Sequence, residues 1–354
     1  MSEPSTPEAE TLVRVEGRAG RITLNRPKAL NALSYAQVGE LQRALDAWRN
    51  DDRVALVILD GAGERGLCAG GDVRALYHAR ESDPRLAARF WADEYRLNAD
   101  IASYPKPFVA IMDGIVMGGG IGLSAHASHR IVTEASRLAM PETAIGLIPD
   151  VGGTWLLSRA PGRLGEYLGL LGTNMGAADG IYANFADAHV ARQDVPQFVS
   201  ALCNRDGHPV GVLVAEATSA PPPATIAGRM SVINRIFAED TVSAIIAAAT
   251  AESAPDWLRE EARGFAHRSP LSMTLTLEAV RRARNVRSLR EALVTEYRLT
   301  NRLFDRGEFL EGVRAQLIDK DRAPKWQHGS VAAIPADEIA GYFAPLEDPT
   351  ELTF

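Results

Sequence analysis

The sequence predicts a mixed α/β fold in which a core of alternating strands and helices is followed by a mainly helical part. Residues 54–59 and 108–112 are short, continuous apolar runs, which are typical of buried strands. Before the first run, apolar residues recur on one face at helical spacing: Val38, Leu41, Leu45 and Trp48. Strands and helices that alternate in this way indicate a layered α/β core.

Turn and cap residues predict the N-terminal elements. Residues 12–24 are expected to form two short strands around a turn at residues 16–20. The Asn-Arg-Pro sequence at residues 25–27 ends the second strand. Ser34 is expected to cap the helix that follows, because its hydroxyl can accept a hydrogen bond from a free backbone N–H group.

The middle of the chain continues this alternation to about residue 190. The glycine triplet at residues 118–120 opens a helix of small residues over 121–126, and residues 130–133 form the next short strand.

Three consecutive prolines at residues 221–223 form the clearest linker in the chain. Beyond them the pattern is mostly helical, as in the apolar stripe of Leu310, Val313 and Leu317. We therefore expect three parts: a flexible tail at residues 1–11, an α/β core at 12–220 and a mainly helical region at 221–354.

The composition excludes several classes of protein. The net charge is -7 and the pI is about 5.6, which argues against nucleic-acid binding because that function needs a basic surface. A local cationic pocket for a phosphate-bearing ligand stays possible. No apolar run is long enough for a transmembrane helix, so we expect no membrane partner.

Cysteine usage and the N-terminal residues predict a cytoplasmic location. The chain has two cysteines, Cys68 and Cys203, unlike a disulfide-rich secreted domain. The first ten residues contain three glutamates and no Lys or Arg, and they resemble neither a signal peptide nor a transit peptide.

Two glycine-rich loops are candidates for an oxyanion hole. They are residues 68–72 (Cys-Ala-Gly-Gly-Asp) and 117–120 (Met-Gly-Gly-Gly). Backbone N–H groups can converge on a carbonyl oxygen where no Cβ blocks the approach. Taken alone, each loop is better explained by close packing or a tight turn. Neither has the residues of a nucleotide phosphate loop or a dinucleotide-binding fingerprint.

Two acids, Glu142 and Asp150, lie in the mostly uncharged segment 140–153, and each directly follows a proline. A carboxylate in such surroundings can have a raised pKa and act as a general acid or base. The alternatives are a helix N-terminal residue for Glu142 and a helix N-cap for Asp150. No Cys/His cluster predicts a metal site, and no Ser or Cys has a recognisable base partner.

These motifs together resemble the crotonase superfamily. The two glycine loops and the Pro141–Glu142 pair occur in its order and spacing, and residues 25–27 and 31–33 resemble its N-terminal signature. A narrower resemblance is to the 3-hydroxyisobutyryl-CoA hydrolases, carried by further segments: 94–98, 140–153, 269–272, 296–299, 309–321 and 324–326. The resemblance therefore extends to both sides of the proline linker.

The resemblance implies a spiral of strand–strand–helix units, a CoA thioester as substrate and no separate cofactor. By position, Gly71 and Gly119 would supply the two oxyanion N–H groups, and Ala69 and Gly70 would line the CoA path. Members of the superfamily often form homo-oligomers, trimers or hexamers, but the extended C-terminal helices of this chain could replace the contacts between subunits, so the sequence leaves the assembly open.

The resemblance also assigns the acids. Glu142 and Asp150 match catalytic residues, and Glu94 matches a substrate-contacting glutamate, although a solvated helix position would otherwise explain Glu94. Together with Gly119, these three acids would contact the acyl group. Glu142 could activate a water or attack the thioester itself, and the sequence leaves both open.

Two departures separate this chain from the hydratases of the superfamily. Hydratases use a second glutamate two residues beyond the glycine triplet, where this chain has Gly122, and they commonly carry glycine where it has Asp150. We therefore expect hydrolysis of a short-chain 3-hydroxyacyl-CoA, as in valine catabolism. The alternatives are an enoyl-CoA hydratase or isomerase, or a non-catalytic CoA-binding paralogue.

Overall fold

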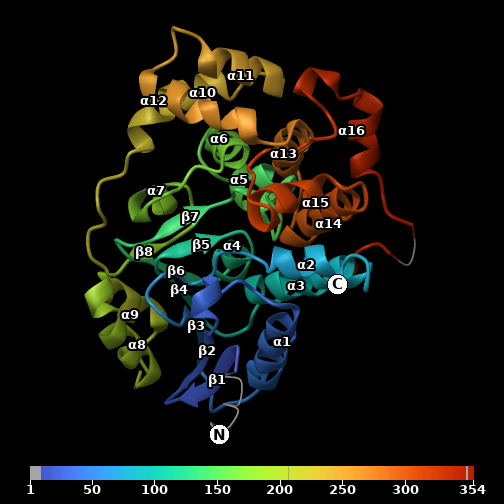
Figure 1. Ribbon diagram of the computed structural model, residues 1–354. Coiled ribbons are helices and arrows are strands. Elements are labelled where there is room, and N and C mark those ends of the chain that lie inside the picture. Colours follow the sequence, from blue (N-terminus) through green and yellow to red (C-terminus); the bar gives the residue numbers. More distant parts are fainter. Residues whose placement is uncertain (1–8, 206, 348–349) are drawn as a thin grey trace, which may run out of the picture.

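A six-stranded sheet forms the centre of the fold in the computed structural model, which describes residues 9–205, 207–347 and 350–354 (Figure 1). β1 pairs antiparallel with β2, and the later neighbours pair in parallel. The strands in sheet order are β1 (Thr11–Glu16), β2 (Ala19–Leu24), β3 (Leu56–Gly61), β4 (Phe108–Met112), β6 (His129–Val132) and β8 (Ala188–His189). A second small sheet pairs β5 (Ile115–Met117) with β7 (Arg137–Ala139). The predicted mixed α/β architecture is confirmed.

Helices cover the sheet and continue beyond it as a second layer (Figure 1). Those before the prolines are α1 (Tyr35–Arg49), α2 (Val73–Ala79), α3 (Leu86–Ala102), α4 (Gly119–Ser124), α5 (Gly153–Ser158), α6 (Leu164–Leu171), α7 (Ala177–Tyr182), α8 (Val195–Cys203) and α9 (Val210–Ala217). Those after the prolines are α10 (Met230–Ile236), α11 (Val242–Thr250), α12 (Asp256–Ala262), α13 (Pro270–Ala283), α14 (Leu289–Asp305), α15 (Glu308–Val313) and α16 (Ala336–Phe343).

Burial on both faces explains the continuous apolar run of β3. Successive strand residues point to opposite faces of a sheet. Leu56 and Ile58 accordingly pack in the cluster that contains α8 and α9, whereas Val57 and Leu59 pack in the larger core on the other face. A strand that is covered on both sides needs apolar residues at every position.

The predicted start of α1 is confirmed in detail. The Ser34 hydroxyl accepts a hydrogen bond from the Gln37 N–H group, and the Gln37 side chain accepts one from the Ser34 N–H group, which together form a capping box. The small-residue helix predicted over 121–126 forms as α4, which begins two residues earlier, at Gly119.

The helical region after the prolines packs directly on the core. α13 contacts α5 and α6, α14 contacts α3 and α5, and α15 contacts the 3₁₀ turn η2 (Glu142–Ile145). One hydrophobic cluster includes residues from both sides of the prolines. The division at residue 220 stays a prediction. Most of the predicted tail lies outside the described residues, and its last residue, Thr11, begins β1.

No helix within the described ranges combines the length and apolar character needed to cross a bilayer.

Candidate active site

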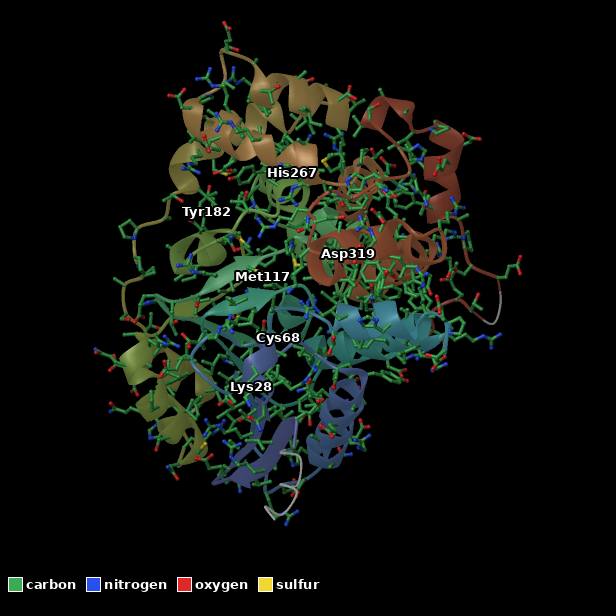
Figure 2. The ribbon with its side chains drawn as sticks, in the orientation of Figure 1. Lys28, Cys68, Met117, Tyr182, His267 and Asp319 are labelled. Carbon is green, nitrogen blue, oxygen red and sulfur yellow. The ribbon has the colours of Figure 1, made fainter. Side chains whose placement is uncertain are left out.

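The two glycine loops lie side by side at the centre of the molecule. The Met117 N–H group donates to the Cys68 carbonyl oxygen over 3.0 Å, and Figure 2 shows both residues in the middle of the fold. Gly70 and Gly118 have φ values of +111° and +48°. Few residues other than glycine adopt these conformations, so each loop needs glycine where the sequence has it.

The backbone N–H groups of Gly71 and Gly119 are close together. A Cβ atom on Gly119 would lie 3.3 Å from the nitrogen of Gly71. Neither N–H group has a hydrogen-bond acceptor in the part of the chain that the structure describes. Two adjacent free donors of this kind suit a single carbonyl oxygen.

A cavity of about 300 Å³ brings all seven predicted site residues together. They are Ala69, Gly70, Gly71, Glu94, Gly119, Glu142 and Asp150. Glu94 comes from α3, Glu142 begins η2, and Asp150 directly precedes the turn into α5. Much of the remaining wall is apolar, including side chains of Leu76, Phe90, Trp91, Ile145, Leu147 and Leu317.

The three acids are buried and incompletely paired. Their exposed fractions are 2% for Glu94, 5% for Glu142 and 5% for Asp150. One carboxylate oxygen of Glu94 and one of Glu142 have no hydrogen-bond partner in the described residues. Burial, and then the charge of Asp150, raise the pKa values of Glu94 and Glu142 well above their usual range. Ionising all three acids together is therefore costly.

Asp150 is held by a tyrosine rather than by a helix end. The Tyr95 hydroxyl donates to its Oδ2 atom over 2.7 Å. Burial raises the pKa of Asp150 to about 7, although this hydrogen bond opposes the rise. The N-cap of α5 is Gly152, so the alternative interpretation of Asp150 as a helix cap is wrong. Glu142 does stand at the start of a short helix, and it also lines the cavity.

Val151 and Asn98 crowd position 122, where the resemblance places the second glutamate of the hydratases. A Cβ atom on Gly122 would lie 2.6 Å from the Cβ of Val151 and 3.0 Å from the amide nitrogen of Asn98. Both contacts are too close for a side chain at position 122 without movement of its neighbours. The close packing around Gly122 therefore agrees with the absence of a glutamate at this position.

Other residues around the acids had no predicted role. They include Tyr95, Glu296 and Arg268. Arg268 directly precedes Ser269, the N-cap of α13, and it donates to the Thr143 hydroxyl over 2.7 Å. Burial lowers the pKa of Arg268 to about 10, against the effect of the nearby Glu142 carboxylate. Tyr95 and Glu296 lie in segments 94–98 and 296–299, which resemble the family. Because no spacing rule links positions so far apart in the sequence, their contacts with the segment around Asp150 could not be predicted.

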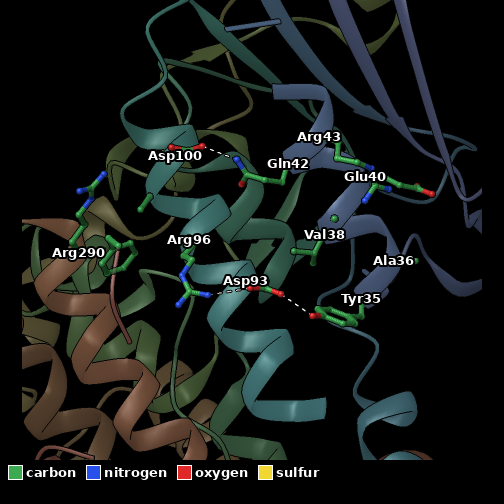
Figure 3. A pocket seen from close by; sticks show the side chains of 13 residues that line it. Tyr35, Ala36, Val38, Glu40, Gln42, Arg43, Asp93, Arg96, Asp100 and Arg290 are labelled. Carbon is green, nitrogen blue, oxygen red and sulfur yellow. Dashed lines mark hydrogen bonds and ion pairs between the residues drawn. The ribbon is translucent and has the colours of Figure 1, made fainter. Parts of the chain in front are cut away.

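A larger cavity of about 730 Å³ lies elsewhere, between the outer faces of α1 and α3 (Figure 3). It contains none of the predicted site residues. Asp93 there accepts from the Tyr35 hydroxyl and pairs with Arg96. Asp100 accepts from the Gln42 amide. Asp93 and Asp100 are thus paired, and Glu40, which has one oxygen without a partner in the described residues, is only partly buried. The smaller cavity, where three buried acids lie together, is therefore the better candidate for chemistry.

Neither cysteine is poised to react. Cys68 and Cys203 are both free and buried, and burial raises the pKa of the Cys68 thiol to about 12. Within the described residues, no group of three His, Cys, Asp or Glu side chains is arranged to hold a metal ion.

Comparison with known proteins identifies the family. The family model described as "Enoyl-CoA hydratase/isomerase" matches residues 19–343. The chain is 38% identical to a mitochondrial 3-hydroxyisobutyryl-CoA hydrolase of Xenopus tropicalis and 35% identical to that of Homo sapiens; each alignment covers 98% of this chain and 91% of the relative.

Two solved structures are also similar over nearly their full length. A carnitinyl-CoA dehydratase from Mycobacterium thermoresistibile is 48% identical, with a TM-score of 0.92, over 98% of both chains. An enoyl-CoA hydratase from Rhodobacter sphaeroides is 45% identical, with a TM-score of 0.91, over 98% of this chain and all of the other. The protein therefore belongs to the enoyl-CoA hydratase/isomerase family, the crotonase superfamily that its glycine loops and Pro–Glu pair resemble.

Proposed function

We propose that this protein hydrolyses a short-chain 3-hydroxyacyl-CoA, with 3-hydroxyisobutyryl-CoA as the leading substrate and 3-hydroxyisobutyrate and CoA as the products. The observation that carries the proposal is the buried Asp150 carboxylate, which shares the cavity with Glu142 while Val151 fills the place of a second glutamate. The relatives named as 3-hydroxyisobutyryl-CoA hydrolases support the same substrate.

In the proposed reaction, the thioester carbonyl lies against the N–H groups of Gly71 and Gly119. These donors stabilise the negative charge that develops on the oxygen, and one such donor contributes about 3 kcal/mol in comparable sites. Ala69 and Gly70 line the path along which CoA reaches the cavity.

Glu142 then either takes a proton from the attacking water, or attacks the carbonyl itself, expels the CoA thiolate and forms an anhydride that a water hydrolyses to the free acid. Its free carboxylate oxygen leaves room for either role. Asp150, whose carboxylate is held by the hydrogen bond from the Tyr95 hydroxyl, orients the water or Glu142. The CoA thiolate needs little protonation to leave, because a thiol pKa is about 8.5.

Enoyl-CoA hydration is the second candidate. It is favoured by the names of the two solved structures, which are more similar in sequence than the reported hydrolases. The packing of Val151 and Asn98 around Gly122 argues against it, because a hydratase would need a glutamate there.

A side-by-side assay of the two reactions tests the proposal. Release of free thiol would be measured with 3-hydroxyisobutyryl-CoA and 3-hydroxypropionyl-CoA, and hydration would be measured with methacrylyl-CoA. We expect rapid thiol release from a hydroxyacyl ester and little hydration, with thiol release lost in Glu142→Gln. Hydration that is faster than thiol release would favour the second candidate.

Three further points belong to the same proposal. The protein acts in valine catabolism, forms a homo-oligomer and works in a reducing compartment such as the cytoplasm. The two free cysteines support a reducing compartment. The hydrolases reported above are named mitochondrial, so the cytoplasmic prediction is not borne out by them. Cell fractionation and sedimentation would test location and assembly.

A further inference from the structure

Glu296 connects the C-terminal helices to the turn that carries Asp150. It lies on α14 and is fully buried. Its carboxylate accepts hydrogen bonds from the N–H group of Gly152 over 2.7 Å and from that of Thr154 over 2.9 Å. The Thr154 hydroxyl donates to it as well. One side chain thus accepts from three donors that lie two and four residues after Asp150 in the sequence.

The turn held by Glu296 has an unusual backbone. Val151 has a φ of +52° and Gly152 one of +80°, so two consecutive residues are left-handed. A β-branched residue rarely adopts such a φ, and it persists only where its surroundings impose it. Asp150 closes the turn through its own carbonyl oxygen, which accepts from the Gly153 N–H group.

The same helix also supports the other contact of Asp150. Tyr95, which donates to the Asp150 carboxylate, packs edge-on against Tyr297, with ring centroids 6.2 Å apart. The Tyr95 hydroxyl also lies 3.5 Å from the hydroxyl of Thr300. α14 therefore supports both the backbone that carries Asp150 and the side chain that orients its carboxylate.

We propose that Glu296 is a positioning residue for the reaction: it holds the turn from Asp150 to Thr154 so that the Asp150 carboxylate faces the cavity and Val151 fills the space beside Gly122. This role rests on the proposed function, because its effect is measured as a change in the rate of thioester hydrolysis. It makes the helical region after the prolines part of the reaction machinery.

A double-mutant cycle tests whether Glu296 acts through Asp150. The variants are Glu296→Gln, Asp150→Asn and the double variant, assayed for thiol release and for affinity towards a non-hydrolysable CoA thioether analogue of the substrate. We expect Glu296→Gln to lower kcat about tenfold or more with little change in KM or affinity, and Glu296→Ala to lower it further. In the Asp150→Asn background, Glu296→Gln should cause no additional loss, because residues that act as one unit are non-additive.

Glu166 provides the matched control. It is another fully buried carboxylate, but it pairs with Arg163 and Arg284. It does not line the smaller cavity, which holds Glu94, Glu142 and Asp150 and is called the acid cavity below. Glu166→Gln should lower stability and leave kcat of the folded protein unchanged. A purely structural role for Glu296 would produce that same result, and would overturn the proposal.

Three further outcomes decide the proposal. Equal losses from Glu296→Gln in the wild-type and Asp150→Asn backgrounds would overturn it. If neither Glu296 variant folds, Thr154→Val removes one donor alone. A several-fold lower kcat that disappears in the Asp150→Asn background supports the role, and an unchanged kcat overturns it.

If the wild type releases no thiol, the proposed function fails, and crystal structures of wild type and Glu296→Gln then decide. A displaced Asp150 with a relaxed Val151 supports positioning, and an unchanged turn contradicts it.

Discussion

The two cavities differ in how deeply their carboxylates are buried and in how most of them are paired. In the larger surface cavity (Figure 3), Asp93 and Asp100 have exposed fractions of 44% and 27% for their side chains, and each pairs with an arginine. In the smaller cavity, Glu94 and Glu142 are nearly inaccessible and each keeps a free oxygen. Glu40 in the larger cavity also has a carboxylate oxygen without a partner in the described residues, but this residue is only partly buried. Three buried acids that meet in one place, rather than cavity volume, select the smaller cavity as the candidate site.

The energetic reason is that the two arrangements cost the fold different amounts. An exposed ion pair contributes about 0–1 kcal/mol to stability. An unpaired buried carboxylate costs considerably more, and it lowers that cost by taking up a proton. A protein keeps such groups mainly where their perturbed acidity has a use, so the comparison itself points to catalysis.

The largest expected effect is that of Glu142→Gln. This change keeps the size of the side chain but removes the base or nucleophile, so kcat for thiol release should fall about a thousandfold. Affinity for the thioether analogue should stay nearly intact. Asp100→Asn, in the surface cavity, is the control and should leave kcat unchanged. A Glu142→Gln enzyme within tenfold of wild type would remove the central role of this acid.

The next effect is that of Gly119→Ala. The added Cβ would lie 2.6 Å from the Glu94 carboxylate and would intrude between the two oxyanion donors. We expect kcat to fall about a hundredfold, the usual effect of disabling one such donor. Gly39→Ala, in the surface cavity, meets only the flexible Arg43 side chain and should leave turnover intact. Similar turnover for both variants would contradict the oxyanion role.

A smaller effect is expected on substrate choice. The free oxygen of Glu94 can pair with the hydroxyl of a 3-hydroxyacyl group. The preference for 3-hydroxyisobutyryl-CoA over isobutyryl-CoA, expressed as kcat/KM, should therefore fall about tenfold or more in Glu94→Ala. Asp93→Ala, the adjacent residue facing the surface cavity, should keep the wild-type preference. Equal rates with both esters in the wild type would exclude this role.

The smallest effect is a pH-dependent change in stability. The pKa of Asp150 is about 7 in the folded state, against about 3.9 when unfolded. Between these values the folded state binds more protons, so the free energy of unfolding falls as pH rises from about 4 to about 7. Asp150→Asn should remove this loss and raise the Tm at about pH 8, with the gain vanishing near pH 4. An unchanged Tm at both pH values would mean that burial of the charge is not costly.

The sequence predicted the parts of the site that are local. Each glycine loop is a short segment whose backbone geometry requires its own residues, and the acids follow prolines in an uncharged stretch. The supporting contacts could not be predicted, because they join distant residues: Tyr95 and Asp150 are 55 positions apart, and Gly152 and Glu296 are 144 apart. The left-handed backbone conformation of Val151 could not be predicted either, because this conformation is expected at glycine and position 151 is a valine.

A crystal structure of Glu142→Gln with 3-hydroxyisobutyryl-CoA would test the central claim most directly, since the intact ester should persist in the disabled enzyme. We predict that the thioester carbonyl oxygen lies within hydrogen-bonding distance of the Gly71 and Gly119 N–H groups, with the acyl group among Glu94, the mutated position 142 and Asp150. An acyl group outside the acid cavity, or a ligand bound in the surface cavity between α1 and α3, would contradict the account.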